Sequence, residues 1–335
     1  MPGPAGLRWP GSQPAGSQPI LKVLFVMDPL DGIDISMDTS FVFLAEAQSR
    51  GHENWFCQID QLLYDDGLAA HTAPVTVKPV QGEHFELGQW SDQRADDFDA
   101  IFMRKDPPFD SDFFFATQLL SLADPARTFV FNNPAGLREI SEKLSILRFP
   151  DLVAETIVTA DPQRVLAFMQ RLGEDVVVKP LDGCGGQGIF RLSAGDLNIN
   201  AILELSTDNG RRQIMAQRYL PASREGDTRL VYLEGRAAGA MRRVPRADDL
   251  RGNLHVGGSV VAAEIGEREH EICRTIEPLL SEAGIYFAGL DIIGGLLTEI
   301  NVTSPTGLQE IKRLGGADLA AEVIDLVERR CPSGH

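Results

Sequence analysis

The sequence predicts an open α/β domain at the N-terminus, followed by a region of mixed α/β and α+β character. Its 335 residues exceed what one hydrophobic core usually organises, so two or three domains or lobes are expected. Apolar strand patterns alternate with helical patterns as far as about residue 133, which is typical of an open α/β sheet. From about residue 227 short strand patterns follow one another, and helical patterns return near the C-terminus.

The composition is typical of a globular protein and narrows the choice of partners. Hydrophobic residues make up 43% of the chain and charged residues 24%, with a net charge of −17. Binding to nucleic acid or to an anionic membrane surface needs a basic surface, so neither partner is expected. No apolar run reaches the ~18 residues of a membrane-spanning helix. A small anionic ligand remains compatible, because it needs only a local group of Lys and Arg.

The N-terminal segment and the cysteines indicate a cytoplasmic location. Residues 1–19 are rich in Pro, Gly, Ser and Gln and lack the apolar core of a secretory signal, so we expect a disordered leader or an upstream start codon. Cys57, Cys184, Cys273 and Cys331 form no CxxC pair, which favours free thiols in a reducing compartment. The histidines show no metal-ligand spacing.

The first domain is expected over residues 20–133. An apolar strand ends at Asp28-Pro29, and a helix capped by Asp38 or Thr39 stops at Gly51. Further strands are predicted within 53–59, 98–110 and 128–134, with a helix over 110–123. Ligands of such sheets bind outside the carboxyl ends of the strands, where the loops 28–39 and 104–110 lie.

The second unit, residues 134–330, is expected to have a lid lobe over about 134–216 and a C-terminal lobe over about 217–330. Asn133 caps its first helix, Pro134 takes the first helical position, and Lys143 projects from that helix. The remaining predicted elements are helices opened by Asp161-Pro162 and near 196–207, 266–284, 304–314 and 317–330, and strands within 175–180, 189–192, 213–221, 228–235 and 236–245.

The stretch "VVVKPLDGCGGQGIFRL", residues 176–192, is suited to binding a polyphosphate. Three valines deliver Lys179 to a strand end, and the following glycines let the backbone turn tightly and direct N–H groups at an anion. These glycines are Gly183, Gly185, Gly186 and Gly188. The stretch is neither a Walker A loop nor a dinucleotide fingerprint. A Gly-rich hairpin with an exposed lysine is the alternative.

Three later segments carry weaker signals. The strand ending in Gln217, Tyr219 and Leu220 could place backbone groups beside an adenine ring, although a plain buried strand is the better explanation of this segment taken alone. Arg229, Arg243 and Arg251 would bind carboxylate or phosphate only if the fold gathers them; otherwise they are solvated charges. The loop 245–258 has the glycines and proline of a mobile lid or of a disordered surface loop.

The stretch "GLDIIGGLLTEINVTSPTG", residues 289–307, places polar side chains in an apolar strand pair. Glu299 and Asn301 share one face because side chains alternate along a strand. A two-residue turn at 294–295 would send Asp291 to the opposite face, whereas a three-residue turn over 294–296 would pair it with Glu299. We expect the longer turn, which makes an oxygen-ligand site for Mg²⁺ from Asp291, Glu299 and Asn301.

The same stretch ends in a further signal. Ser304 can cap a helix with Pro305 at its first position, which would leave free N–H groups beside the metal for a carboxylate.

Taken together, the motifs resemble those of bacterial glutathione synthetases, a family of the ATP-grasp superfamily. The resemblance runs from "VLFVMDPL" onward and rests on several motifs at once. They are "RKDPPFD", "EKL", "VVKPLDGCGGQGIFR", "MAQRYLP", "GDTR", "RGNL", "GLDIIG" and "LTEINVTSPTGLQEI".

The resemblance implies an ATP-grasp fold with an N-terminal open α/β domain, and a ligase that joins γ-glutamylcysteine to glycine with hydrolysis of ATP. Activation of the carboxylate as an acyl phosphate needs no protein nucleophile. Mg²⁺, or Mn²⁺ in its place, would stabilise the transferring group together with Lys and Arg. A homo-oligomer, in this family a tetramer, is implied as well.

The resemblance also implies roles for individual residues. Arg229, Lys179 and Arg251 would be catalytic. ATP would contact Lys143, Lys179, Gly183, Gly185, Gly186, Gly188, Gln217, Tyr219, Leu220 and Asp227. The peptide substrate would contact Arg243, Arg251, Asn253, Ser304, Pro305 and Thr306. The metal would be held by Asp291, Glu299 and Asn301.

Some features depart from the family pattern, and some alternatives stay open. Cys184 stands where the family usually has Met, so the Gly-rich loop is expected to be sensitive to oxidation. The strand pair near Arg243 is one residue short. An ATP-grasp ligase for another amino acid or carboxylate is the first alternative, and a nucleotide-binding regulatory protein with an inactive site is the second. A Rossmann dehydrogenase is a distant third.

Overall fold

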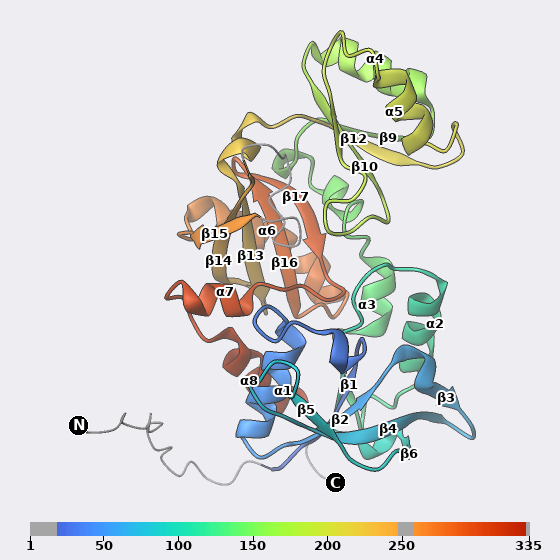
Figure 1. Cartoon of the computed structure of the whole chain (residues 1–335), viewed down its shortest axis with the longest axis vertical. Coiled ribbons are helices and arrows are strands. Elements are labelled where there is room, and N and C mark those ends of the chain that lie inside the picture. Colours follow the sequence, from blue (N-terminus) through green and yellow to red (C-terminus); the bar gives the residue numbers. More distant parts are fainter. Residues whose placement is uncertain (1–18, 247–257, 333–335) are drawn as a thin grey trace, which may run out of the picture.

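The fold consists of three β-sheets and their helices (Figure 1). A computed structural model describes residues 19–246 and 258–332. Most of the predicted lid loop 245–258, including Arg251 and Asn253, lies outside the described residues, as does most of the leader. No helix within the described ranges is long and apolar enough to cross a membrane.

The N-terminal sheet has the predicted parallel core. β1 (Lys22–Val26) lies between β2 (Glu53–Cys57) and β7 (Ala100–Met103), and β7 pairs with β8 (Phe129–Phe131). The predicted helices are α1 (Thr39–Ser49) and α2 (Ser111–Leu120). Asp38 and Asp110 cap them by accepting the backbone N–H of the third helical residue, at 2.6 and 2.9 Å. The loops that follow β1 and β7 therefore lie at one edge of the sheet.

This sheet also has an antiparallel extension that the sequence analysis did not predict. It comprises β3 (Leu62–Tyr64), β4 (Leu68–Val77), β5 (Phe85–Leu87) and β6 (Ser91–Arg94). Strands β5 and β6 have few or no buried side chains, so the apolar pattern that identifies a strand is missing from them.

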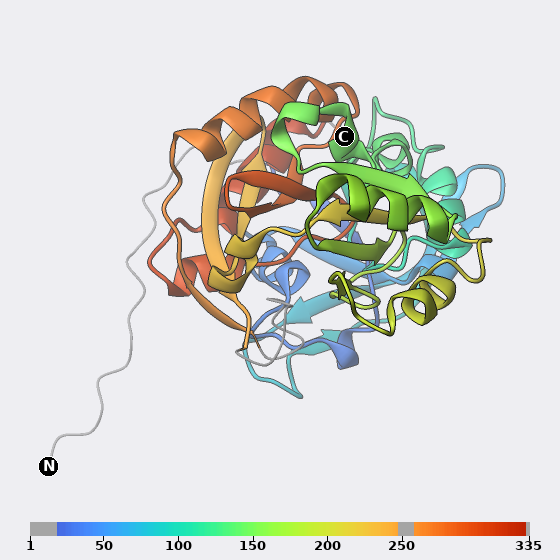
Figure 2. The same cartoon turned by 90° about the horizontal axis from the view of Figure 1, so that it is seen from above.

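A smaller lobe follows in the chain and lies at the top of Figure 1. Its antiparallel sheet has the order β11-β10-β12-β9, and α4 and α5 pack on it around a separate group of buried side chains. The elements are β9 (Thr156–Thr159), α4 (Pro162–Leu172), β10 (Val176–Pro180), β11 (Phe190–Leu192), α5 (Ile199–Ser206) and β12 (Ile214–Arg218). Figure 2 looks down on this lobe from above.

The helix before this lobe is shorter than predicted. α3 (Pro134–Glu139) has the predicted cap, because Asn133 accepts the N–H of Ala135 at 2.9 Å. The helix ends at Glu139, however, and Lys143 lies in the turn that follows. The prediction that Lys143 projects from the helix is therefore wrong.

The C-terminal sheet is antiparallel, with the order β15-β14-β13-β16-β17. Its strands are β13 (Asp227–Leu233), β14 (Arg236–Val244), β15 (Ser259–Ala262), β16 (Phe287–Ile293) and β17 (Leu296–Asn301). The helices of this region are α6 (Glu267–Glu282), α7 (Leu308–Arg313) and α8 (Leu319–Arg330). β15 was not predicted from the sequence.

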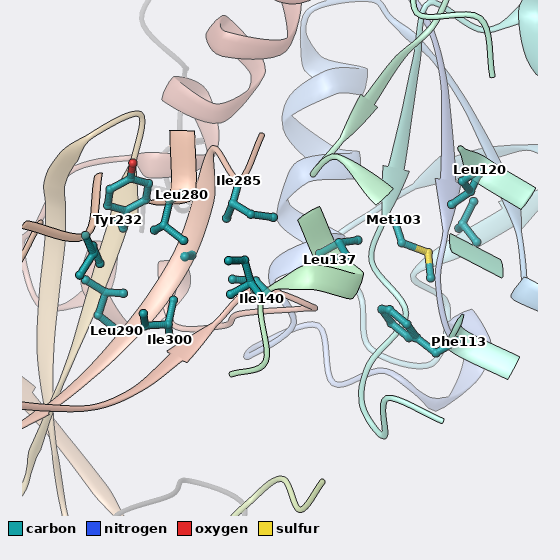
Figure 3. Close-up of a cluster of buried hydrophobic side chains, with 14 of the residues drawn as sticks. Met103, Phe113, Leu120, Leu137, Ile140, Tyr232, Leu280, Ile285, Leu290 and Ile300 are labelled. Carbon is teal, nitrogen blue, oxygen red and sulfur yellow. The ribbon is translucent and has the colours of Figure 1, made fainter. Parts of the chain in front are cut away.

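The N-terminal and C-terminal sheets share one continuous apolar interior. Figure 3 shows Met103 and Phe113 of the N-terminal domain, Leu137 and Ile140 of the connecting segment, and Leu290 of β16 in one row of buried side chains. The cavity described below therefore lies against a body built from both sheets.

Candidate active site

A cavity of about 960 Å³ is lined by all three parts of the chain. The N-terminal domain contributes the loops after β1 and β7, the smaller lobe contributes the Gly-rich loop, and the C-terminal sheet contributes β13, β14, β16 and β17. All the predicted site residues in the described ranges except Gly188 line it. These are Lys143, Lys179, Gly183, Gly185, Gly186, Gln217, Tyr219, Leu220, Asp227, Arg229, Arg243, Asp291, Glu299, Asn301, Ser304, Pro305 and Thr306, with Gly188 in the same loop.

The strand pair β16–β17 places Asp291 opposite Glu299, as predicted, but by a different turn. The turn has two residues, Gly294 and Gly295, which have φ angles of +56° and +77°. The extra residue is Thr298, which forms a β-bulge where the register shifts between Asp291 and Ile292. The predicted three-residue turn is wrong, and the bulge produces the predicted pairing.

Two lysines reach this strand pair from the other side of the cavity. Lys143 Nζ lies 2.8 Å from Glu299 Oε1 and also donates to the carbonyl oxygen of Gly183. Lys179 Nζ donates to the carbonyl oxygen of Thr298 at 3.1 Å. Burial lowers the pKa of Lys179 to about 8, although the negative charge of Glu299 opposes that shift. Both ammonium groups are buried, so an anion entering the cavity meets cations with little hydration.

The Gly-rich loop has the backbone that only glycine adopts readily. Gly185, Gly186 and Gly188 have φ angles of +61°, +79° and +69°. At Gly183 a Cβ atom would lie 2.6 Å from Cγ of Pro180, so a side chain there would clash. Cys184 is exposed in this loop.

Asp291 is bound by two arginines at once. Arg229 donates to both carboxylate oxygens, at 2.6 and 3.1 Å, and Arg243 Nη2 lies 2.9 Å from Oδ2. Burial would raise the pKa of Asp291, but the two guanidinium groups hold that pKa well below its usual range. Arg243 also donates to Asp227 through Nε at 2.8 Å. Burial raises the pKa of Asp227 against the pull of Arg243.

The residues at the end of β12 line the cavity and also contact other parts of the smaller lobe. Gln217 Nε2 donates to Thr156 Oγ1 at 2.9 Å, and the Tyr219 ring lies 4.1 Å from the Arg191 guanidinium carbon. The backbone N–H of Tyr219 donates to the carbonyl of Asp175 at 2.8 Å. Tyr219 therefore contributes to the cavity while its ring also contacts the sheet of the smaller lobe.

The segment Ser304–Thr306 is not helical, so the helix predicted to start at Ser304 is wrong. α7 begins at Leu308, after Gly307 with φ +123°. The segment is held in this non-helical conformation because Arg104 Nη2 donates to the carbonyl of Pro305 at 3.1 Å and Arg229 Nη1 to that of Thr306 at 3.2 Å. Its three residues line the cavity without offering a helix N-terminus.

Two further residues organise the cavity and were not assigned a role from the sequence. Glu142 Oε1 accepts from the N–H groups of Val302 and Thr303 and from Thr303 Oγ1, at 2.9, 3.1 and 2.9 Å. It thereby fixes the turn that carries Lys143 against the end of β17. Arg104, which is 3% exposed, donates to Ser40 Oγ and to Pro305. Both residues lie inside "EKL" and "RKDPPFD", and only their positions in the fold reveal these contacts.

The oxygen donors of β16–β17 fit a hard divalent cation. In the described ranges no group of three His, Cys, Asp or Glu side chains could hold a metal ion. Asp291, Glu299 and Asn301 instead offer two carboxylates and one carboxamide. Asn301 Nδ2 donates to the carbonyl of Gly289 at 3.1 Å and to Asp291 Oδ2 at 3.3 Å, so the carboxamide lies beside the Asp291 carboxylate. The low pKa of Asp291 keeps its carboxylate in the anionic form that a metal needs.

Comparison with known proteins agrees with this geometry. The family model for the ATP-grasp domain of prokaryotic glutathione synthetase matches residues 142–316, and the model for the N-terminal domain of that enzyme matches residues 21–138. The chain belongs to the prokaryotic glutathione synthetase family. Family membership confirms the resemblance inferred from the motifs and implies that the enzyme uses ATP and a divalent metal.

Individual relatives of the glutathione synthetase family cover nearly the whole chain. The glutathione synthetase of Thermosynechococcus vestitus is 45% identical over 314 residues, which is 91% of this chain and 98% of that protein. The glutathione synthetase of Gloeobacter violaceus is 45% identical over 320 residues, which is 93% of this chain and 98% of that protein.

Solved structures with the same fold are more distant in sequence. The D-cycloserine synthetase DcsG superposes with a TM-score of 0.64 at 16% identity, and the ATP-grasp ligase PsnB with 0.60 at 20%. Each covers 92% of this chain and 99% of its own. They confirm the predicted ATP-grasp fold.

Proposed function

We propose that the cavity is the site at which the chain joins γ-glutamylcysteine to glycine and hydrolyses ATP to ADP and phosphate. ATP-dependent synthesis of glutathione is the function that family membership supports. The observation that carries the assignment of the site is that buried lysines beside a Gly-rich loop meet the oxygen donors of β16–β17 in one cavity.

The nucleotide is assigned to the side of the cavity that carries the two lysines. Lys143 and Lys179 would contact the phosphates, and the loop Gly183–Gly188 would close over them with its N–H groups. Gln217, Tyr219 and Leu220 would line the adenine, and Asp227 would lie near the ribose or the phosphates. The division into an N-terminal domain (20–133), a lid lobe (about 134–216) and a catalytic lobe (about 217–330) belongs to this proposal.

Asp291, Glu299 and Asn301 would hold the metal, which we propose to be Mg²⁺, with Mn²⁺ as an alternative. When bound, such a cation neutralises charge on the phosphate oxygens. Lys143 and Arg229, which pair with Glu299 and Asp291 in this structure, would then be released to face the phosphates. The ion pairs of Asp291 with the two guanidinium groups keep that carboxylate ionised before substrates bind.

The chemistry begins at the substrate carboxylate, which attacks the γ-phosphorus of ATP and releases ADP. Arg229, Lys179 and Arg251 would stabilise the negative charge of the transferring group. The amine of glycine then attacks the resulting acyl phosphate, a C–N bond forms, and the C–O bond to phosphate breaks as the amine loses its proton. Arg243, Arg251, Asn253 and the segment Ser304–Thr306 would position the peptide substrate and keep water from the acyl phosphate.

The quaternary state and the compartment are part of the same proposal. A homo-oligomer, a tetramer by resemblance, and a cytoplasmic location would suit an enzyme of small-molecule substrates with a net charge of −17 and no paired cysteines.

A substrate panel tests the assignment. ADP release is measured with γ-glutamylcysteine and glycine, with each substrate alone, and with other amino acids in place of glycine, each with and without Mg²⁺. We expect turnover only with the complete set and metal. Turnover with a different carboxylate–amine pair, and none with this one, would identify another ATP-grasp ligase.

The metal assignment predicts a large effect at Glu299. Glu299→Ala removes an oxygen ligand and the carboxylate partner of Lys143, so kcat should fall on the order of 100-fold or more. The matched control is Glu282→Ala, at the exposed end of α6, which should keep wild-type kcat. Wild-type activity of Glu299→Ala would remove Glu299 from the site and would favour the regulatory-protein alternative.

A further inference from the structure

Glu142 binds the end of β17 through both its side chain and its backbone. Its Oε1 accepts from the N–H groups of Val302 and Thr303 and from Thr303 Oγ1, at 2.9, 3.1 and 2.9 Å. Its backbone carbonyl accepts the N–H of Ile300 at 2.9 Å. One residue in the turn after α3 therefore takes up the donors of the short segment 300–303.

On one side, these bonds place Lys143, the residue that follows Glu142. Lys143 Nζ lies 2.8 Å from Glu299 Oε1 and donates to the carbonyl of Gly183 in the Gly-rich loop. Lys143 is 6% exposed, so its ammonium reaches the cavity from a buried position. The backbone of Lys143 is thus placed by hydrogen bonds that its neighbour makes with β17.

On the other side, the same bonds place the start of the segment Ser304–Thr306. Thr303 directly precedes this segment, is 5% exposed, and is bound to Glu142 through both its N–H and its Oγ1. Two arginines bind carbonyls farther along the segment. The position of Ser304–Thr306 therefore depends on Glu142 at its beginning and on the arginines beyond.

The bonds to the Glu142 side chain need an oxygen acceptor rather than a negative charge. The three donors all bind Oε1, and no residue in the described part of the chain donates to Oε2. Burial raises the pKa of Glu142, and the negative charge of Glu299 raises it further. A carboxamide would keep the acceptor oxygen and remove this repulsion, so Gln should reproduce the contacts that Ala would lose.

We propose that Glu142 is a positioning residue for two substrates, ATP and γ-glutamylcysteine. It holds Lys143 where the ammonium meets the ATP phosphates, and it holds Ser304–Thr306 where they meet the peptide substrate. Glu142 acts through these residues and does not touch the reacting atoms. Neither group is assigned to glycine, so the binding of glycine should not depend on Glu142. The proposal rests on the assignments of Lys143 and of Ser304–Thr306 made above.

Steady-state kinetics of the full chain, with each substrate varied in turn, tests this role. Glu142→Ala should raise KM for ATP and for γ-glutamylcysteine about tenfold or more, because the bonds to Oε1 are lost, and should leave KM for glycine unchanged. Glu142→Gln should stay within about threefold of the wild-type values, since its carboxamide oxygen accepts the same donors.

Glu139→Ala is the matched control. The Glu139 carboxylate is 66% exposed, pairs with Arg148 at 3.1 Å and does not line the cavity, so every KM should keep its wild-type value. Circular dichroism and thermal unfolding show whether each variant is folded.

Thr303→Val is a milder variant that carries the test if Glu142→Ala does not fold. It removes one donor from Oε1 on the peptide side. Because Glu142 is then held less firmly, KM for ATP should rise about threefold, although Thr303 is not assigned to the nucleotide. Combined with Glu142→Ala, Thr303→Val should raise KM for ATP no further, since both changes break the same contact.

Lys143→Ala separates a failure of this proposal from a failure of the site assignment. It should raise KM for ATP, and an unchanged value would remove Lys143 from the nucleotide site and overturn the proposal with it. If Lys143→Ala raises KM for ATP but neither Glu142→Ala nor Thr303→Val does, the positioning role is wrong and the assignment of Lys143 stands. Glu142→Gln as impaired as Glu142→Ala, or a rise in KM for glycine as large as that for ATP, would also contradict the role.

Discussion

Asp291 shows how single residues in this site are set by their neighbours. A buried carboxylate would ordinarily take up a proton, but two guanidinium groups lie within 3.1 Å of its oxygens and keep it ionised. Removing either arginine alone would leave the buried carboxylate with only one guanidinium partner. The resulting loss in the free energy of unfolding exceeds what the ion pair itself contributes. The two arginines and the aspartate therefore act as one unit, and their variants should not be additive.

Lys179 gives a pH dependence whose sign follows from its pKa of about 8. The folded pKa lies below the ordinary value of 10.5, so the ammonium that would bind phosphate is lost as pH rises through about 8. We expect kcat/KM for ATP to fall above that pH, by up to about tenfold per unit. Over the window from about 8 to 10.5 the unfolded chain holds this proton more tightly, so the contribution of Lys179 to stability rises with pH.

Lys179→Arg provides the matched comparison for this prediction. A guanidinium stays protonated throughout the range, so the fall in kcat/KM for ATP should move to higher pH, whatever the absolute rate of the variant. The measurement is a pH profile at saturating glycine and γ-glutamylcysteine. Coincident profiles for the two proteins would show that another group causes the fall.

The residues of the candidate site could be predicted from the sequence, but the backbone conformation around them and their hydrogen-bond partners could not. Asp291, Glu299 and Asn301 interrupt an apolar strand pattern, and polar residues at such positions can be recognised from the sequence alone. Ser304 followed by Pro305 looks like a helix start, yet Arg104 and Arg229 bind the carbonyls of Pro305 and Thr306 and keep the segment out of a helix. Those arginines are about 200 and 77 positions away, so no local pattern encodes the outcome.

At the scale of elements, the pair β16–β17 joins a tight turn to a bulge. The two-residue turn at Gly294-Gly295 alone would put Asp291 and Glu299 on opposite faces, and the bulge at Thr298 returns them to the same face. The sequence shows the glycines but not the bulge, because bulges have no composition of their own. The polar strands β5 and β6 were not predicted either, because they lack the alternating apolar residues by which a strand is recognised.

The positive φ angle in the turn predicts that the stability lost on substituting Gly295 depends on which residue replaces it. Its φ angle is +77°, and a Cβ atom there would lie 3.5 Å from Arg268 Cγ, an ordinary contact. Backbone strain rather than space therefore decides the effect of substitution. Gly295→Val should lower the free energy of unfolding by about 1–2 kcal/mol, whereas Gly295→Asn, which tolerates this conformation, should lose less.

Thermal and urea unfolding of the two Gly295 variants test this reasoning. Equal losses for Val and Asn would mean that the side chain, and not the backbone angle, is the cause. If the register depends on the turn, kcat should fall in parallel with stability in Gly295→Val.

At the scale of the whole molecule, the two larger sheets form one body. The rings of Phe43 and Phe131 in the N-terminal domain lie 5.7 and 6.2 Å from that of Phe287 in β16. Asn132 donates to the carbonyl of Phe287 at 2.7 Å and accepts from the N–H groups of Tyr286 and Phe287. The lobe with β9–β12 instead has its own group of buried side chains, which includes Val165, Phe168 and Leu203. Met215 of β12 nevertheless packs in the interior shared by the two larger sheets, so the lobe is joined to the body at that strand. An enzyme that must admit and release a nucleotide gains from this division, because the lobe keeps its own buried side chains together when it moves.

This division predicts where a core substitution is felt. Leu203→Ala removes a fully buried side chain from the small lobe and should cost about 2–5 kcal/mol locally, so amide hydrogen exchange should increase within residues 156–218 and little elsewhere. Phe287→Leu lies between the two large sheets, so exchange should increase in both, in β1, β7 and β8 as well as in β13 and β16. Exchange monitored by mass spectrometry separates these patterns. A Phe287→Leu effect confined to the C-terminal sheet, or a Leu203→Ala effect spread over the N-terminal sheet, would contradict the division into one body and one opening lobe.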